Sequence, residues 1–282
     1  MSGWLVLLVA TPILIGSSLL GGLGPMVMKA SHLRLQLALS FVSGLMLGVA
    51  LLHLLPDAIE KLGSVERGTS LALLGVITVF LLMRFMHVHS GEPELDEHAQ
   101  CGHSHRPTRS GGAIRWVTLL AGLSLHSMVD GAALASSIRL EAGALWPGLP
   151  VLIVVALHKP LDALAIVSMV GEHPRRRRQV NLVYALVAPA AAWVVYLGIV
   201  GAGDAGQMVA GVAMAYCAGA FLCVALADLM PEVQFHSHHR MVLTLALALG
   251  VGVSVLLGMA EDLGGSDAGH AAPTRAGVVT NP

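Results

Sequence analysis

The sequence contains few charged residues for its length. Only 12% of its 282 residues are Asp, Glu, Lys or Arg, whereas a typical globular domain has roughly 25%. Apolar residues make up 55% of the chain, and the mean hydropathy is +0.76. A soluble protein of this size could not cover its surface with so few charges, so the composition predicts an integral membrane protein.

Cysteine, aromatic residues and net charge are also scarce. The three cysteines show no CxxC spacing, and Cys217 and Cys223 lie inside an apolar run, where free cysteine usually acts as a small packing residue. Aromatic residues are only 4% of the chain. A net charge of −1 argues against a nucleic-acid partner. Glycine is abundant instead, with 32 residues, and small residues allow helices to approach closely in lipid.

Long apolar runs are frequent along the chain. A helix needs about 20 mostly apolar residues to cross the hydrocarbon core, and the alternation typical of membrane barrels is absent. The first run is too long for a cleaved signal peptide and lacks a basic segment before it. We therefore predict an all-α, polytopic bundle of eight transmembrane helices, at residues 4–28, 35–59, 69–88, 116–138, 148–170, 180–200, 206–229 and 242–259.

The basic residues of the loops predict the orientation of the bundle. Lys and Arg concentrate in cytoplasmic loops of membrane proteins. If both termini lie outside the cytoplasm, the outer side carries only Lys61, Arg67, Arg139 and Arg275. The inner side then carries Lys29, Arg34, Arg84, Arg106, Arg109, Arg115, the run 175–178 and Arg240.

Two connections on the predicted inner side are rich in histidine, which is a compositional sign of metal binding. The first is a polar loop at 89–115, and the second follows the seventh span. We expect one transmembrane domain at 1–262 and a disordered tail at 263–282. The candidate loop ligands are His98, His103, His105, His236 and His238.

Two spans carry the same polar motif near their centres. His126 and Asp130 in the fourth span, and His158 and Asp162 in the fifth, both read H-x-x-x-D. Residues four apart share one helix face, so two facing helices would supply two nitrogens and two oxygens, a set that suits Zn²⁺. Ionisable groups inside a span are expensive and are functional by default. Helix-helix adhesion alone would not require the spacing twice.

Two further residues of the fifth span bear on this site. Pro160 removes a backbone hydrogen bond, and broken or kinked helices are common at transporter sites. Lys159 is a cation beside a predicted cation site. It either pairs with Asp130 or Asp162, or extends to water.

A second matched motif lies at two span ends. The second span ends in His53-Leu-Leu-Pro-Asp57, and the seventh in Asp228-Leu-Met-Pro-Glu232. The two spans run in opposite directions in the predicted topology, as do spans four and five, which indicates a 3+2+3 inverted repeat. These motifs are either ordinary helix ends near water or metal-attracting mouths of the transport pathway.

These residues resemble the ZIP family of divalent-metal transporters. The segment from His126 to Gly131 looks like the family's H-N-x-x-D-G, and that from His158 to Asp162 like its H-E-x-P-H/E. The span-end motifs are similar to its LLP-acid and MLPE endings. The resemblance covers residues 4–259. It implies uptake of divalent metal into the cytoplasm, elevator-like movement of spans one, four, five and six against the others, and homodimers.

Three positions depart from the family pattern. Ser127, which we expect in the transport pathway, replaces the family's Asn, Lys159 replaces an acid, and the proline comes one residue early. The second metal site that the family often has is therefore expected to be absent. We expect no prosthetic group and no enzyme activity. The substrate is predicted to be Zn²⁺, with Fe²⁺, Mn²⁺ and Cd²⁺ left open, and the location a plasma membrane, such as a bacterial inner membrane.

Two other functions fit part of the pattern. An intramembrane zinc hydrolase would use the same ligands to activate water, but it has no use for acidic clusters at both mouths. A cation efflux carrier also uses H-x-x-x-D motifs, but it usually has fewer spans and a soluble metal-binding domain. The direction of transport separates efflux from uptake.

Overall fold

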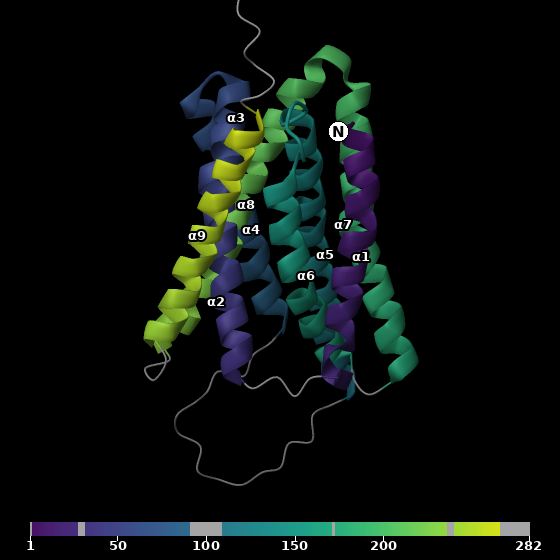
Figure 1. The fold of residues 1–282 in the computed structure, drawn as a ribbon. Helices are drawn as coiled ribbons and strands as arrows, with labels where there is room; N and C mark the ends of the chain where they lie inside the picture. Colours follow the sequence, from purple (N-terminus) through teal and green to yellow (C-terminus); the bar gives the residue numbers. More distant parts are fainter. Residues whose placement is uncertain (1, 28–31, 91–108, 171–172, 236–239, 266–282) are drawn as a thin grey trace, which may run out of the picture.

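The structure, a computed structural model, describes residues 2–27, 32–90, 109–170, 173–235 and 240–265, and most of them are helical (Figure 1). Within these ranges, eight helical segments are long and apolar enough to cross a membrane, as predicted. The elements are α1 (Gly3–Val27), α2 (His32–Val49), η1 (Ala50–Leu54), α3 (Leu55–Leu62), α4 (Val65–Ser90), α5 (Arg109–Leu140), α6 (Leu149–Met169), α7 (Pro174–Gly201), η2 (Gly203–Ala205), α8 (Gly206–Phe235) and α9 (Arg240–Gly265).

The second membrane span is composite. It joins α2, the π-helical turn η1 and α3 into one apolar segment, Leu33–Leu62. The π-helical turn comes just before Pro56, which lacks an N–H and whose ring would clash with a carbonyl one turn earlier. A widened turn accommodates both defects, and π-bulges often occur at functional sites. The sequence motif contains the proline, but it did not indicate the π-helical turn before it.

The helices extend past three of the expected boundaries. Helix α4 continues to Ser90 and α5 begins at Arg109, so both ends of the expected loop 89–115 are helical. Helix α9 extends to Gly265, three residues into the expected tail. Adding residues to an existing helix gains one hydrogen bond for each residue fixed, so helices extend beyond the apolar segments that define the spans.

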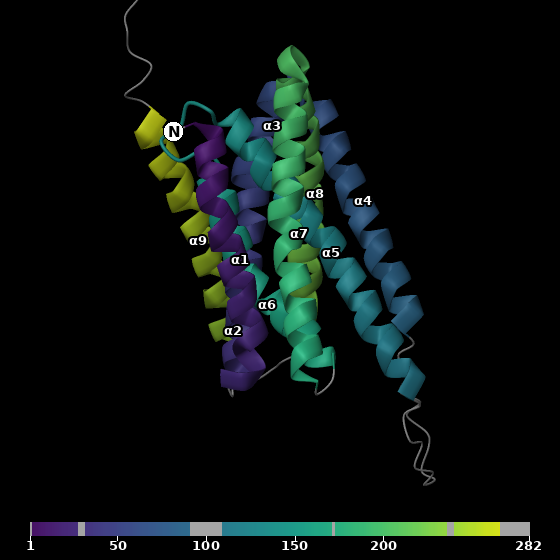
Figure 2. The same ribbon diagram turned by 90° about the vertical axis from the view of Figure 1, so that its right-hand side faces the viewer.

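The helices form two groups that stand side by side in Figure 1. One group contains α1, α5, α6 and α7, and its closest pairs are α5 with α7 and α1 with α6. The other contains α2, α4, α8 and α9, and its closest pairs are α2 with α9 and α4 with α8. Figure 2 shows the same helices from the side, with α1 and α6 close together.

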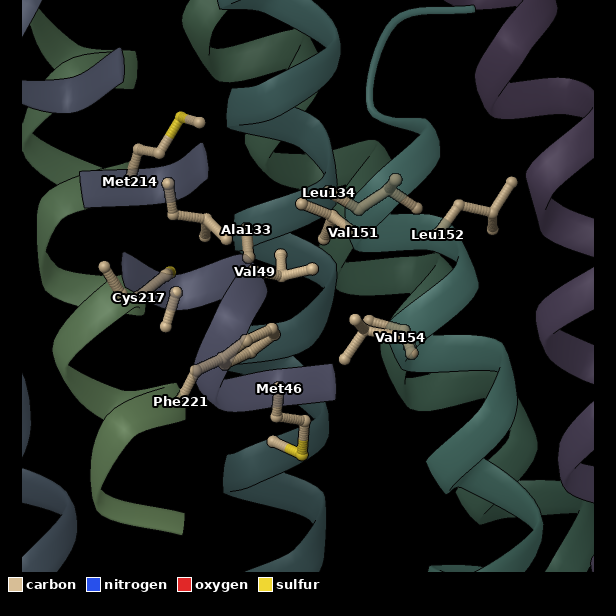
Figure 3. Packing of buried hydrophobic residues seen from close by; sticks show 14 of the residues in the cluster. Met46, Val49, Ala133, Leu134, Val151, Leu152, Val154, Met214, Cys217 and Phe221 are labelled. Carbon is tan, nitrogen blue, oxygen red and sulfur yellow. The ribbon is translucent and has the colours of Figure 1, made fainter. Parts of the chain in front are cut away.

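The two groups meet over an apolar core. Helices α2 and α8 supply one side of it and α5 and α6 the other (Figure 3). Close packing of such surfaces is stabilised by dispersion as well as burial. The core side chains drawn and labelled are Met46, Val49, Ala133, Leu134, Val151, Leu152, Val154, Met214, Cys217 and Phe221.

Candidate metal centre

Helices α5 and α6 are joined by a short connection that a carboxylate holds in place. Glu141 accepts a hydrogen bond from the backbone N–H of Gly148 at 2.6 Å and a second from the hydroxyl of Ser137. Gly148 has φ +75°, a conformation that favours glycine. The connection turns the chain so that α6 returns beside α5, and it brings the two H-x-x-x-D motifs to the same depth.

The four predicted ligands come together between α5 and α6. His126, Asp130, His158 and Asp162 each offer one ligand atom, and these atoms lie within 4.8 Å of one another. His126 Nε2 is 3.6 Å from Asp130 Oδ1, and His158 Nε2 is 3.2 Å from Asp130 Oδ2. Asp130 is fully buried, whereas the Asp162 side chain is 17% exposed. The cluster is thus screened from water except at Asp162.

The histidines have ring nitrogens available for an ion. His158 Nδ1 lies 2.9 Å from the carbonyl oxygen of Val154. A carbonyl can only accept, so Nδ1 carries the proton and a neutral ring presents its Nε2 lone pair to the cluster. This bond to a carbonyl fixes the ring in the way that metal-ligating histidines are commonly fixed.

The donor set fits a zinc ion. Asp130 Oδ1 and His126 Nδ1 are buried without a hydrogen-bond partner, which is costly unless another group binds there. Two nitrogens and two oxygens at about 2.1 Å from Zn²⁺ in a tetrahedron would lie about 3.4 Å apart. The observed spread of up to 4.8 Å requires only a small inward movement of the side chains.

Lys159 points into the cluster rather than toward water. It is 1% exposed, and its Nζ lies 2.5 Å from Asp130 Oδ2 and 3.6 Å from Asp162 Oδ2. The pairing with both acids that the sequence left open is therefore present. A buried ammonium needs such partners, because an unpaired charge in this environment is very unfavourable.

Helix α6 runs through Pro160 without a break, so of the broken or kinked helix that the sequence suggested, the break is not present. The backbone of Pro160 lies against Gly21 of α1, where a Cβ atom would overlap its carbonyl. Helix α1 therefore packs closely against α6 at the proline.

A third helix contributes a residue that the sequence did not indicate. Tyr184 of α7 donates a hydrogen bond to Asp162 Oδ2 at 2.8 Å and accepts one from Lys159 at 3.3 Å. The Lys159 ammonium also lies 5.3 Å from the centre of the tyrosine ring, within the range of a cation–π contact. The sequence offers only a weak indication of this role, namely a polar aromatic residue inside the sixth span.

Comparison with known proteins identifies the family. The family model described as ZIP Zinc transporter matches residues 4–111 and 89–260. The chain belongs to the ZIP zinc transporter family. It is therefore a multi-pass membrane transporter and not an enzyme, which excludes the hydrolase alternative.

Several animal ZIP proteins are similar to this chain. Zinc transporter ZIP9-A of Xenopus laevis is 28% identical over 257 residues, which cover 77% of this chain and 82% of that protein. Zinc transporter ZIP9 of Micropogonias undulatus is 34% identical over 182 residues, covering 61% of this chain and 53% of that protein.

Of the other residues predicted for the ZIP transport pathway, Ser127 lies beside the cluster, and the rest lie apart from it or outside the described side chains. His53 is buried in η1, with Nε2 2.9 Å from the Ser254 carbonyl of α9. Ser127 is buried beside the site, and Asp57 is half-buried in α3. Asp228 and Glu232 lie in α8, but their side chains are outside the described set. The loop residues His98, His103, His105, His236 and His238 are also outside the described residues.

Proposed function

We propose that this protein carries Zn²⁺ into the cytoplasm through the site formed by His126, Asp130, His158 and Asp162. One observation carries the proposal. Four potential ligand atoms from two membrane-spanning helices lie within 4.8 Å of one another, and the site is almost closed to water. The names of the related zinc transporters support zinc as the ion. Mixed nitrogen and oxygen ligands would also accept Fe²⁺, Mn²⁺ or Cd²⁺.

The movement we propose is elevator-like. The group α1, α5, α6 and α7 holds the site and slides as one body past α2, α4, α8 and α9. The helix contacts support this division, because the four closest helix pairs each fall within one group. The apolar core between the groups supports it as well, since such surfaces can shift without breaking ion pairs.

An inverted repeat underlies this arrangement in our proposal. Suppose that spans one to three correspond to spans six to eight, and span four to span five. Helix α1 then corresponds to α7, and α6 to α5, so the helix pair α1–α6 corresponds to the pair α7–α5. In the same way α2 with α9 corresponds to α8 with α4. All four are the closest pairs in their groups. Repeats of this kind place the substrate site where the two halves meet.

The proposed path starts outside, at His53 and Asp57, and ends inside, at Asp228 and Glu232 and the histidine-bearing loops. Both termini then lie outside the cytoplasm. His53 Nε2 faces a backbone carbonyl, so its contribution to the path would require a rotation of the ring. We further propose a homodimer in a bacterial plasma membrane, with no prosthetic group.

Lys159 replaces a second metal ion in this scheme. With both carboxylates ionised and Lys159 protonated, the site carries one negative charge when empty and one positive charge with a divalent ion. One ion would move in each cycle. The Lys159→Glu variant should therefore bind a second zinc ion in purified protein measured by elemental analysis. Binding of only one ion by that variant counts against this role.

The direction of transport can be tested in proteoliposomes whose protein is inserted in a single known orientation. We expect saturable zinc entry when the predicted outer side faces the added zinc. Transport that proceeds only from the cytoplasmic side, driven outward, would instead support efflux. Vesicles that carry protein of the His158→Ala variant serve as the control for leakage.

A further inference from the structure

Tyr184 forms hydrogen bonds with Asp162, one of the four candidate ligands, and with the neighbouring Lys159. We propose that Tyr184 is a positioning residue that leaves Asp162 one oxygen for the ion, and so sets a four-coordinate site that prefers Zn²⁺ over Mn²⁺. This inference rests on the proposed transport of zinc through the same site. It adds the ion preference and the residue on α7 that determines it.

The tyrosine hydroxyl is fixed by two hydrogen bonds. It donates to Asp162 Oδ2 at 2.8 Å and accepts from Lys159 Nζ at 3.3 Å. Tyr184 is 1% exposed, so water does not compete for these bonds. The contact of Lys159 with Asp162, at 3.6 Å, falls on the same oxygen. Oδ2, which is also 4.0 Å from His158 Nε2, is therefore held by the tyrosine hydroxyl and the ammonium, and Oδ1 is the oxygen of Asp162 that remains for the ion.

Asp130 is restricted in the same way by other groups. Lys159 Nζ donates to its Oδ2 at 2.5 Å, whereas the unprotonated His158 Nε2, 3.2 Å from the same oxygen, keeps its lone pair for the ion. Its Oδ1 is buried without a hydrogen-bond partner and faces His126 Nε2 at 3.6 Å. Each carboxylate thus has one oxygen held by Lys159 or Tyr184 and one that is not, and each histidine has one nitrogen in the cluster.

This donor count selects among divalent ions. Two nitrogens and two single carboxylate oxygens make a four-coordinate set, which suits Zn²⁺. Mn²⁺ prefers a six-coordinate, oxygen-rich environment. A carboxylate released from its hydrogen bond can bind an ion through both oxygens, which raises the coordination number. Loss of the Tyr184 hydroxyl would give Asp162 this freedom and would favour the manganese ion.

The test compares zinc and manganese uptake by the full-length protein in proteoliposomes. In Tyr184→Phe we expect the ratio of kcat/KM for zinc to that for manganese to fall by about tenfold, the usual scale for loss of a group that orients a metal ligand. Tyr196→Phe is the matched control, because Tyr196 lies on the same helix but near Gly3 rather than the site. Its ratio should equal that of the unmodified protein.

A second measurement does not depend on how well a variant folds. The unmodified protein loaded with Co²⁺ should show the intense visible bands of four-coordinate cobalt, and weak six-coordinate bands overturn the inference. An unchanged zinc-to-manganese ratio in a Tyr184→Phe protein that still carries zinc also overturns it and leaves the proposed function standing. Absence of zinc uptake by the unmodified protein overturns the proposed function, and this inference with it.

Discussion

His158 Nε2 on α6 lies 3.2 Å from Asp130 Oδ2 on α5, so the two polar motifs are joined across helices as well as along them. Lys159 approaches the same oxygen. Asp130 is therefore the centre of the site, because it contacts a histidine of its own helix, a histidine of the next helix and the buried ammonium. Its removal should affect stability and transport together.

Replacement of Asp130 should destabilise the protein strongly. Asp130→Ala leaves the Lys159 ammonium buried with only part of its pairing, and loss of one partner of a buried ion pair typically costs about 3–5 kcal/mol. The thermal unfolding midpoint of purified protein should fall. The double variant Asp130→Leu with Lys159→Met should recover most of that loss but should not transport zinc. Asp204→Ala, at an exposed position, is the control and should leave the midpoint unchanged.

A low midpoint in the double variant that equals that of Asp130→Ala would contradict this reading. It would mean that the carboxylate supports the fold through contacts other than the lysine.

The centre of the site could be predicted from the sequence because helical geometry fixes it. A spacing of four residues places His126 with Asp130, and His158 with Asp162, whatever surrounds them. Eight spans could be predicted for a similar reason, since a bilayer requires long apolar segments. Both predictions depend on the local sequence and on the lipid bilayer around the protein rather than on the packing of distant residues.

Other features depend on contacts between distant segments, and the sequence did not indicate them. Tyr184 reaches the site only because α7 packs against α5 and α6. The orientation of His53 toward Ser254 depends on the close packing of α2 with α9. Pro160 suggested a broken helix, but the contact with Gly21 could not be read from the motif that contains the proline.

Gly21 should tolerate no large side chain. A Cβ atom there would overlap the carbonyl of Pro160, two residues before Asp162, whereas a Cβ on Gly16 of the same helix meets no other atom within 4 Å. Overpacking of this kind typically costs about 1–3 kcal/mol. We expect Gly21→Leu to lower the unfolding midpoint and to slow zinc uptake, and Gly16→Leu to do neither. Equal behaviour of the two variants would argue against the tight contact of α1 with α6.

A covalent link between the two helix groups should stop transport. The Cys217 thiol of α8 lies 3.5 Å from the carbonyl of Val129 on α5, so Val129→Cys would place a second thiol on the facing helix. In a background with Cys101 and Cys223 replaced by serine, a short thiol cross-linker should abolish zinc uptake, and its reductive cleavage should restore it. The matched control carries Val129→Cys with Cys217→Ser. Full uptake in the cross-linked protein would contradict sliding of one group past the other.

The most direct test of the central claim is the uptake of radioactive zinc into oriented proteoliposomes by the unmodified protein and by His126→Ala and Asp162→Ala. The two substitutions remove one ligand from α5 and one from α6. We expect saturable uptake by the unmodified protein and loss of it in both variants, with each variant still eluting as folded protein on size-exclusion chromatography. Equal, unsaturable leakage through all three proteins would contradict transport through this site.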